Sequence, residues 1–157
     1  MKYFPQLKAL VFIAALLPLG RLAWFGYAGE LGANPIEFIT RSLGTWTLVF
    51  LFFSLCVTPL RHLSGWIWLI KLRRIVGLFA FFYASLHFIT YIWLDQFFDL
   101  NAMVKDVIKR PFITIGFAAF ILLLPLAITS SNAMMKKLGG KSWQRLHWLI
   151  YIIAILA

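Results

Sequence analysis

Three histidines occur in this chain of 157 residues, and two of them fall inside apolar segments. His87 lies in the stretch YASLHFITY, within a range, 75–94, that contains no charged residue. An ionisable side chain at membrane depth is costly and marks a functional site by default. His147 lies in a second apolar segment, whereas His62 lies at the end of another, where an interfacial, solvated histidine is the simpler interpretation. His87 and His147 are therefore the candidate site residues.

Small residues share a helical face with His87. Counting back three, seven and ten positions gives Ala84, Ala80 and Gly77, and counting forward four gives Tyr91. Two interpretations stay open. Small residues let two helices approach closely, with the histidine hydrogen-bonding across the interface. They also leave a slot for a flat macrocycle whose iron the imidazole can bind.

The two histidines are predicted to lie at different depths. At 1.5 Å per residue, His147 lies about 6 Å from Trp143, near the end of its segment, while His87 lies about 20 Å from Arg74. We therefore expect that the two imidazoles do not face each other across one iron. An axial partner for His87 is expected on the last segment, at or beyond residue 156.

The segments that position these residues are too apolar for a soluble domain. The composition is 62% hydrophobic and 18% aromatic, so water is not the main solvent. Four runs are long enough to cross a hydrocarbon core of about 30 Å; they cover residues 9–27, 43–60, 75–94 and 111–130. A cleaved signal peptide over residues 1–29 is the alternative for the first run.

The last apolar run is shorter than the others. From Leu146 to Ala157 a helix covers only about 18 Å. We expect a fifth span over residues 143–157 whose end is missing or is completed by another chain. The predicted fold is an all-α polytopic membrane bundle in one domain, 1–157, with four complete spans and a truncated fifth.

The charges predict an orientation. Five basic residues and all five acidic residues fall on one side of the predicted spans, and ten basic residues fall on the other. Because the positive-inside rule places the more basic side in the cytoplasm, we expect the N-terminus and the second and fourth loops there. The net charge of +10 then reflects topology and lipid contact rather than nucleic-acid binding. The ten basic residues on the cytoplasmic side are Lys2, Lys8, Arg61, Lys71, Arg73, Arg74, Lys136, Lys137, Lys141 and Arg145.

The connecting segments contain further signals. The loop 95–110 mixes charges and is predicted to hold a short surface helix, after which Pro111 suits the first turn of a helix. Gly139 and Gly140 are predicted to stop a helix. Trp143 lies near a predicted span end, as expected of an aromatic belt. A single cysteine, Cys56, excludes a disulfide framework and is interpreted as a packing residue.

Several segments resemble those of the MsrQ (YedZ-like) family, within the ferric-reductase-like transmembrane superfamily. They are LGANP, TPL, RRIVGL, ASLH with the threonine and tyrosine that follow it, RPFITIG and TSSNAMMKKLGGKSWQRLHWLIY. Members are haem-binding membrane subunits of bacterial periplasmic methionine sulfoxide reductase systems. The resemblance covers nearly all of the chain and implies six spans, haem b, FMN and a place in the bacterial inner membrane.

The resemblance also implies roles for particular residues. His87 corresponds to the haem ligand on the third span and His147 to the first histidine of the fifth. The family's further histidine on that span, and its sixth span, are expected beyond Ala157, so that the domain is C-terminally incomplete. An inner-haem histidine of the wider superfamily is replaced by Arg73, which does not ligate iron while protonated. His147 is then expected near flavin or quinone, or as an alternative metal ligand.

Arg73 and Arg74 are candidates for binding the flavin phosphate, because a guanidinium fork matches phosphate oxygens. The alternative is that they form part of the basic cytoplasmic side and bind no cofactor.

The resemblance implies an electron-transfer subunit rather than the catalytic subunit of an oxidoreductase. Electrons would pass from the quinone pool or a cytoplasmic flavin reductase, through FMN and haem b, to a periplasmic molybdopterin enzyme that repairs oxidised methionine in envelope proteins. One alternative is a stand-alone ferric or quinone reductase. A second is a non-redox membrane assembly protein or proton-relay bundle, in which the histidines are buried hydrogen-bonding groups. A haem absorption band separates the redox hypotheses from the non-redox one.

Overall fold

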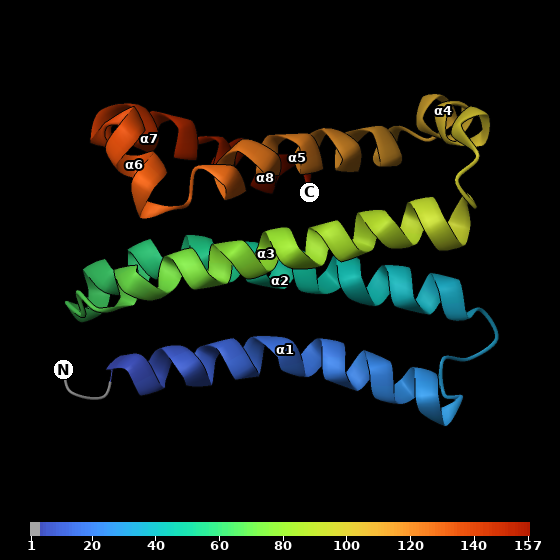
Figure 1. The fold of residues 1–157 in the computed structure, drawn as a ribbon, viewed down its shortest axis with the longest axis horizontal. Helices are drawn as coiled ribbons and strands as arrows, with labels where there is room; N and C mark the ends of the chain where they lie inside the picture. Colours follow the sequence, from blue (N-terminus) through green and yellow to red (C-terminus); the bar gives the residue numbers. More distant parts are fainter. Residues whose placement is uncertain (1–3) are drawn as a thin grey trace. The chain divides into compact units, whose positions relative to one another are not determined.

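The computed structural model describes residues 4–157, and those residues form helices and connecting turns without a strand (Figure 1). Lys2, one of the basic residues counted above, lies outside the described residues. In chain order the elements are α1 (Phe4–Ala28), α2 (Pro35–Ser64), α3 (Leu69–Thr90), the π-helix η1 (Tyr91–Asp95), α4 (Leu100–Lys109), α5 (Pro111–Ile128), α6 (Asn132–Leu138), α7 (Gly140–His147) and α8 (Leu149–Leu156).

Four of these helical segments are long and apolar enough to cross a membrane: Phe4–Ala28, Pro35–Ser64, Leu69–Asp95 and Pro111–Ile128. Many of their large apolar side chains, such as Leu17, Phe53 and Ile128, are exposed, which suits a surface solvated by lipid. The all-α membrane bundle predicted from the sequence is therefore confirmed. Residues 143–157 are not one continuous helix, because α7 ends at His147 and α8 begins at Leu149.

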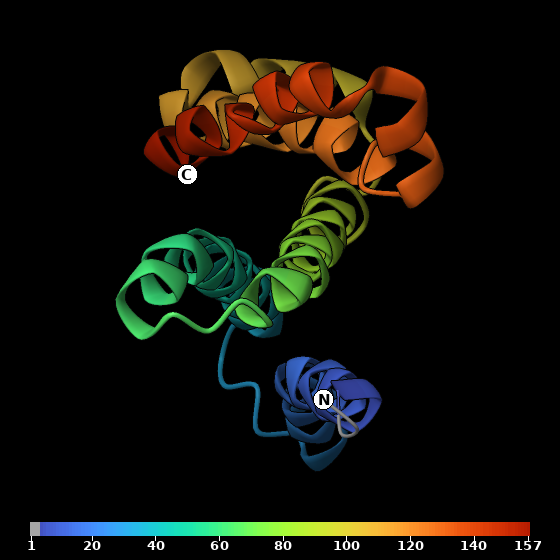
Figure 2. The same cartoon turned by 90° about the vertical axis from the view of Figure 1, so that its left-hand side faces the viewer.

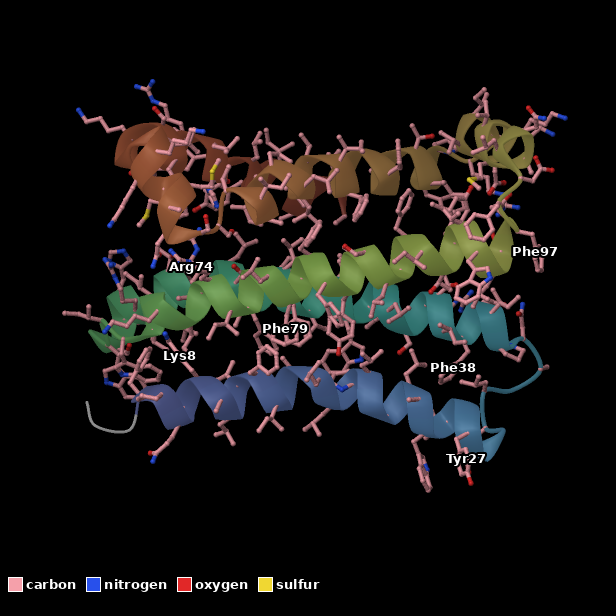
Figure 3. The ribbon with its side chains drawn as sticks, in the orientation of Figure 1. Lys8, Tyr27, Phe38, Arg74, Phe79 and Phe97 are labelled. Carbon is pink, nitrogen blue, oxygen red and sulfur yellow. The ribbon has the colours of Figure 1, made fainter. Side chains whose placement is uncertain are left out.

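The chain divides into two compact units, one ending at Ala80 and the other beginning at Phe81, so that α3 contributes to both. In the first unit Phe79 of α3 packs against Phe12 of α1 and Phe50 of α2, with ring centroids 5.1 and 5.7 Å apart. Figure 3 shows the Phe79 ring directed toward α1. Gly77 also meets α2, since a Cβ there would lie 3.4 Å from the Ser54 hydroxyl. The small residue at position 77 therefore serves close helix packing.

In the second unit, α8 returns along α5, and α6 and α7 form the turn between them (Figures 1 and 2). The short helix α4 runs across the start of α5 instead of continuing its direction (Figure 1). The short helix predicted in the loop 95–110 is confirmed as a helix, and Pro111 lies in the first turn of α5 as expected.

The helix ends follow from local chemistry. The Asn34 carboxamide accepts a hydrogen bond from the Glu37 backbone N–H, which caps α2. Gly139 ends α6 with a φ of 76°, a conformation that glycine adopts without a steric penalty. The prediction of a helix stop is confirmed for Gly139 and wrong for Gly140, which is the first residue of α7.

Candidate cofactor site

His87 lies on the inward side of α3. The residues three, four and seven positions before it, Ala84, Tyr83 and Ala80, are buried, and Tyr83 is 0% exposed. The opposite side of the helix is exposed at Phe82 and Ile89. His87 itself is half-buried. Because residues three and four apart share a helical face, the imidazole points away from the lipid-facing side of a membrane-spanning helix.

Aromatic contacts fix the position of His87 along the axis of α5. The ring of Phe88, the next residue, lies 4.7 Å from Phe120 and 5.7 Å from Phe117, measured between centroids. About two helical turns earlier, Phe81 stacks on the same Phe120 ring at 6.0 Å. Offset and edge contacts of this kind stabilise helix pairs through dispersion and quadrupole attraction. The second half of α3 and the middle of α5 are thereby held in register.

His147 is held by polar contacts. Its Nδ1 atom lies 3.0 Å from the Trp143 carbonyl oxygen, one turn earlier in α7. A carbonyl oxygen only accepts, so Nδ1 is the protonated nitrogen. In the neutral ring, Nε2 then presents a lone pair, and the Nε2 atom is buried. This arrangement, with a backbone carbonyl fixing the tautomer, is typical of imidazoles that bind metals through Nε2.

Trp143 orients the His147 ring in a second way. The indole and imidazole rings stack with centroids 3.8 Å apart and planes inclined by 26°. The indole Nε1–H donates a hydrogen bond of 2.8 Å to the Thr129 carbonyl oxygen, just after α5 ends. Trp143 therefore fixes the imidazole of α7 to the end of α5.

Each histidine has a neighbour that contacts α5: Phe88 beside His87, and Trp143 beside His147. The positions of these contacts along α5 give the separation of the two imidazoles along the helix axis. Phe120 marks the level of His87, and Thr129 marks the level of His147. Nine residues of helix separate these two positions, which is about 13 Å at 1.5 Å per residue. Two imidazoles at such different depths do not ligate one iron. The structure therefore brings Trp143 and His147 together and leaves His87 apart from them.

A polar cluster follows His87 at the end of α3. The helix continues as the π-helix η1, an element frequent at functional sites. Its first residue, Tyr91, donates a hydrogen bond to the Asp106 carboxylate at 3.3 Å. Asp106 also forms an ion pair of 2.9 Å with Arg110. These contacts close the end of the span with satisfied polar groups.

The other sequence candidates lie in the first unit. Arg73 is half-buried and Arg74 is exposed, on the first turns of α3. His62 is exposed near the end of α2, in agreement with its interpretation as a solvated residue.

The donor chemistry suits haem better than a bare metal ion. A bare ion such as zinc usually takes three or four protein ligands. No cluster of three or more histidine, cysteine, aspartate or glutamate side chains occurs within residues 4–157. Haem iron needs only one or two axial ligands from the protein, since the porphyrin supplies the other four nitrogens. Single half-buried imidazoles such as His87 and His147 fit that requirement.

Comparisons with known proteins agree with this fold. The family described as ferric reductase like transmembrane component matches residues 40–157. Three relatives are each named protein-methionine-sulfoxide reductase heme-binding subunit MsrQ. No solved structure is significantly similar to the chain.

The relative from Herminiimonas arsenicoxydans is 66% identical over 97% of this chain and 71% of its own length. The relative from Azospira oryzae is 57% identical over 96% of this chain and 64% of its own length. The relative from Ralstonia nicotianae is 53% identical over 99% of this chain and 71% of its own length. The chain is therefore a multi-pass membrane protein that belongs to the ferric-reductase-like transmembrane family and, within it, to the MsrQ group.

The sequence did not single out the positioning role of Trp143. The four-residue spacing from Trp143 to His147 was its only signal, and that spacing is also typical of an aromatic belt. The contact with the Thr129 carbonyl joins residues 14 apart across a turn, and no local pattern predicts it.

Proposed function

We propose that this chain is a haem-binding, electron-transferring membrane subunit of a methionine sulfoxide reductase system. The observation that supports it best is the half-buried His87 imidazole on the inward side of a membrane-spanning helix. The names of the MsrQ relatives, which describe those proteins as heme-binding subunits, support the same proposal.

In this proposal His87 is an axial ligand of haem b. The small side chains of Ala84 and Ala80 lie on the same face of α3 as His87, beside the buried Tyr83, and the Phe88 contacts with α5 fix the position of α3 along α5. Haem b, when bound, supplies a one-electron carrier whose potential depends on axial ligand, burial and hydrogen bonding. The chain contributes a fixed imidazole and surroundings that exclude water.

His147 serves a different group in this proposal, because its depth differs from that of His87. The Trp143 contacts hold the His147 ring beside the end of α5, and in this proposal its Nε2 atom binds a group on the cytoplasmic side. That group is either a second iron, as the assignment of His147 as a metal ligand requires, or the flavin or quinone at which electrons enter. Replacing an iron ligand changes the haem absorption and magnetic circular dichroism spectra, whereas replacing a hydrogen-bonding contact to flavin or quinone leaves the haem ligands unchanged.

FMN is the proposed entry cofactor, with Arg73 and Arg74 binding its phosphate. The argument is chemical: a guanidinium group offers paired N–H donors that match two phosphate oxygens. Replacing both arginines by glutamine is expected to lower FMN retention at least about tenfold if one bidentate pair is lost. The flavin released on denaturation measures it, and unchanged flavin content would show that the pair is only part of the basic cytoplasmic side.

The proposed partners are a periplasmic molybdopterin reductase and an electron donor, which is the quinone pool or a cytoplasmic flavin reductase. Reducing one methionine sulfoxide takes two electrons and two protons and releases water, so the donor must supply two electrons per turnover. The proposed location is the bacterial inner membrane with the N-terminus in the cytoplasm, as the asymmetry of basic residues predicts.

Absorption spectroscopy of the purified membrane protein tests the haem assignment. We expect the wild type to show a Soret band and His87→Ala to lose most of it. His62→Ala is the matched control, since His62 is an exposed histidine in α2. We expect this control to retain the wild-type haem content.

Three results would contradict the proposal. A colourless wild type would favour the non-redox hypothesis, in which the histidines are buried hydrogen-bonding groups. A wild-type spectrum in His87→Ala would refute His87 as the ligand. Loss of the band only in His147→Ala would transfer the assignment to His147.

A second candidate function is a stand-alone ferric or quinone reductase, which the description of the matching family favours. The two candidates differ in the electron acceptor. We expect the reduced protein to transfer electrons to a periplasmic molybdopterin enzyme faster than to a ferric chelate. The opposite order would favour the second candidate.

A further inference from the structure

The short helix α4 exposes an apolar stripe. Leu100, Val104 and Ile108, spaced four apart, are 73%, 58% and 77% exposed. At this spacing the three side chains lie along one side of the helix. The two residues just before the N-cap Asp99, Phe97 and Phe98, are also exposed. Figure 3 shows the Phe97 ring extending away from the end of α3.

The opposite side of α4 is fixed to the ends of two membrane-spanning segments. Asp106 accepts hydrogen bonds from Tyr91 and Gln96 at the end of the third span. The Thr114 hydroxyl of α5 donates a hydrogen bond to the Val107 carbonyl oxygen. These contacts determine which side of α4 faces away from the protein, and that side contains the apolar stripe.

The connections keep α4 close to the level at which the spans leave the membrane. Four residues, 96–99, link η1 to α4, and a single residue, Arg110, links α4 to α5. Four extended residues reach at most about 14 Å. Because α4 runs across the start of α5 (Figure 1), its axis lies across the direction of the spans. The helix therefore lies beside the end of the third span and the start of the fourth.

The backbone before α4 has an unusual conformation that exposes two aromatic rings. Phe97 and Phe98 have φ values of 48° and 61°, which are uncommon for residues other than glycine. Such a conformation is costly and persists where the surroundings stabilise it. Exposed phenylalanine rings gain such stabilisation where lipid, and not water, surrounds them.

The charges beside the stripe match a lipid surface. Lys105 and Lys109 are exposed on the side of α4 next to Val104 and Ile108. A helix with an apolar stripe bordered by lysines lies in the interface plane, with the apolar face inserted and the lysines at the headgroups. We propose that α4, together with Phe97 and Phe98, is an interfacial lipid-binding helix that anchors this end of the bundle in one membrane leaflet. Lipid phosphates are its polar ligands.

Single-cysteine labelling tests this proposal without relying on haem. Cys56 is the chain's only cysteine, so Cys56→Ser provides the background for Val104→Cys, Ile108→Cys and the control Lys105→Cys. Each variant, labelled with an environment-sensitive fluorophore, is reconstituted into vesicles of phosphatidylethanolamine and phosphatidylglycerol. Circular dichroism checks that helix content is unchanged.

We expect labels at 104 and 108 to be quenched by nitroxide-bearing lipids and protected from iodide present on both sides. Insertion of about 5–10 Å into the headgroup boundary should lower iodide quenching at least about threefold relative to the label at 105. Equal iodide access at 104, 108 and 105 would overturn the proposal. Labels that become protected only when a soluble periplasmic protein is added would also overturn it, in favour of protein docking.

Discussion

The two imidazoles of the second unit are positioned by different kinds of contact. His147 is oriented by a hydrogen bond to the Trp143 carbonyl and by stacking on the same residue's indole. His87 is positioned through burial and through the aromatic packing of its neighbour Phe88 against α5. Polar contacts fix the direction of a ring nitrogen, whereas packing fixes the height of a helix.

The two kinds of contact suit the different surroundings of the two histidines. Within an apolar surrounding each unsatisfied polar group is expensive, so packing is the main means of fixing the position of a helix there. A group near the surface has backbone carbonyls available where helices end, as at Thr129. The different positions of the two histidines along the helices therefore agree with the different contacts that hold them.

The largest effect is expected on the haem spectra of variants at His87 and His147. If they serve different groups, His87→Ala should remove a haem signal that His147→Ala leaves unchanged. The double variant should then show the sum of the two single effects. Loss of the same signal in both single variants would mean that the two residues bind one iron, and the separation measured along α5 would be wrong.

The aromatic packing beside His87 should respond next most strongly. Phe120 stacks on both Phe81 and Phe88, so Phe120→Ala should lower the free energy of unfolding by about 2 kcal/mol, because lipid replaces the lost packing only partly. Unfolding in mixed detergent measures the loss. Phe112→Ala, at an exposed residue of α5, is the control and should change stability little.

A smaller effect is expected at Trp143. Trp143→Phe keeps a ring for stacking and removes the hydrogen bond to the Thr129 carbonyl, so the free energy of unfolding should fall by about 1 kcal/mol. If His147 ligates iron, its spectral component should broaden while that of His87 stays sharp. Equal changes in both components would indicate a general loss of structure instead of a local effect on His147.

The smallest effect is expected at an exposed ion pair outside both regions. Glu37 and Arg41 of α2 lie 2.7 Å apart, with side chains 49% and 80% exposed. Glu37→Gln should cost only about 0.3–0.5 kcal/mol, because water and salt screen such pairs. This measurement supplies a baseline against which the effects at Phe120 and Trp143 are judged. If Glu37→Gln lowered the free energy of unfolding as much as Phe120→Ala does, the effect at Phe120 could not be assigned to its aromatic contacts.

Much of the fold followed from the sequence because uncharged runs and lipid thickness determine where spans lie. The helix boundaries did not: α2 begins at Pro35 and ends at Ser64, well beyond the apolar run 43–60. The extra turns depend on local caps, such as Asn34 and Gly65, which act independently of hydropathy.

The candidate site was predicted less completely. The face shared by His87, Ala84 and Ala80 follows from helical periodicity, and the structure shows the two alanines buried. Gly77, predicted to lie on the same stripe, meets Ser54 of α2 and so serves helix packing. The contacts of Phe88 with α5 and of Trp143 with Thr129 join different helices, and spacing within one helix does not encode the register between two.

Ligand replacement at position 87 tests the central claim most directly. Near-infrared magnetic circular dichroism of the ferric protein identifies axial ligands, and the wild type should show a histidine-ligated haem. In His87→Met the band should move to the position characteristic of methionine ligation, because the residue at 87 supplies the ligand. A band that remains at the wild-type position after this substitution would show that another residue binds the iron.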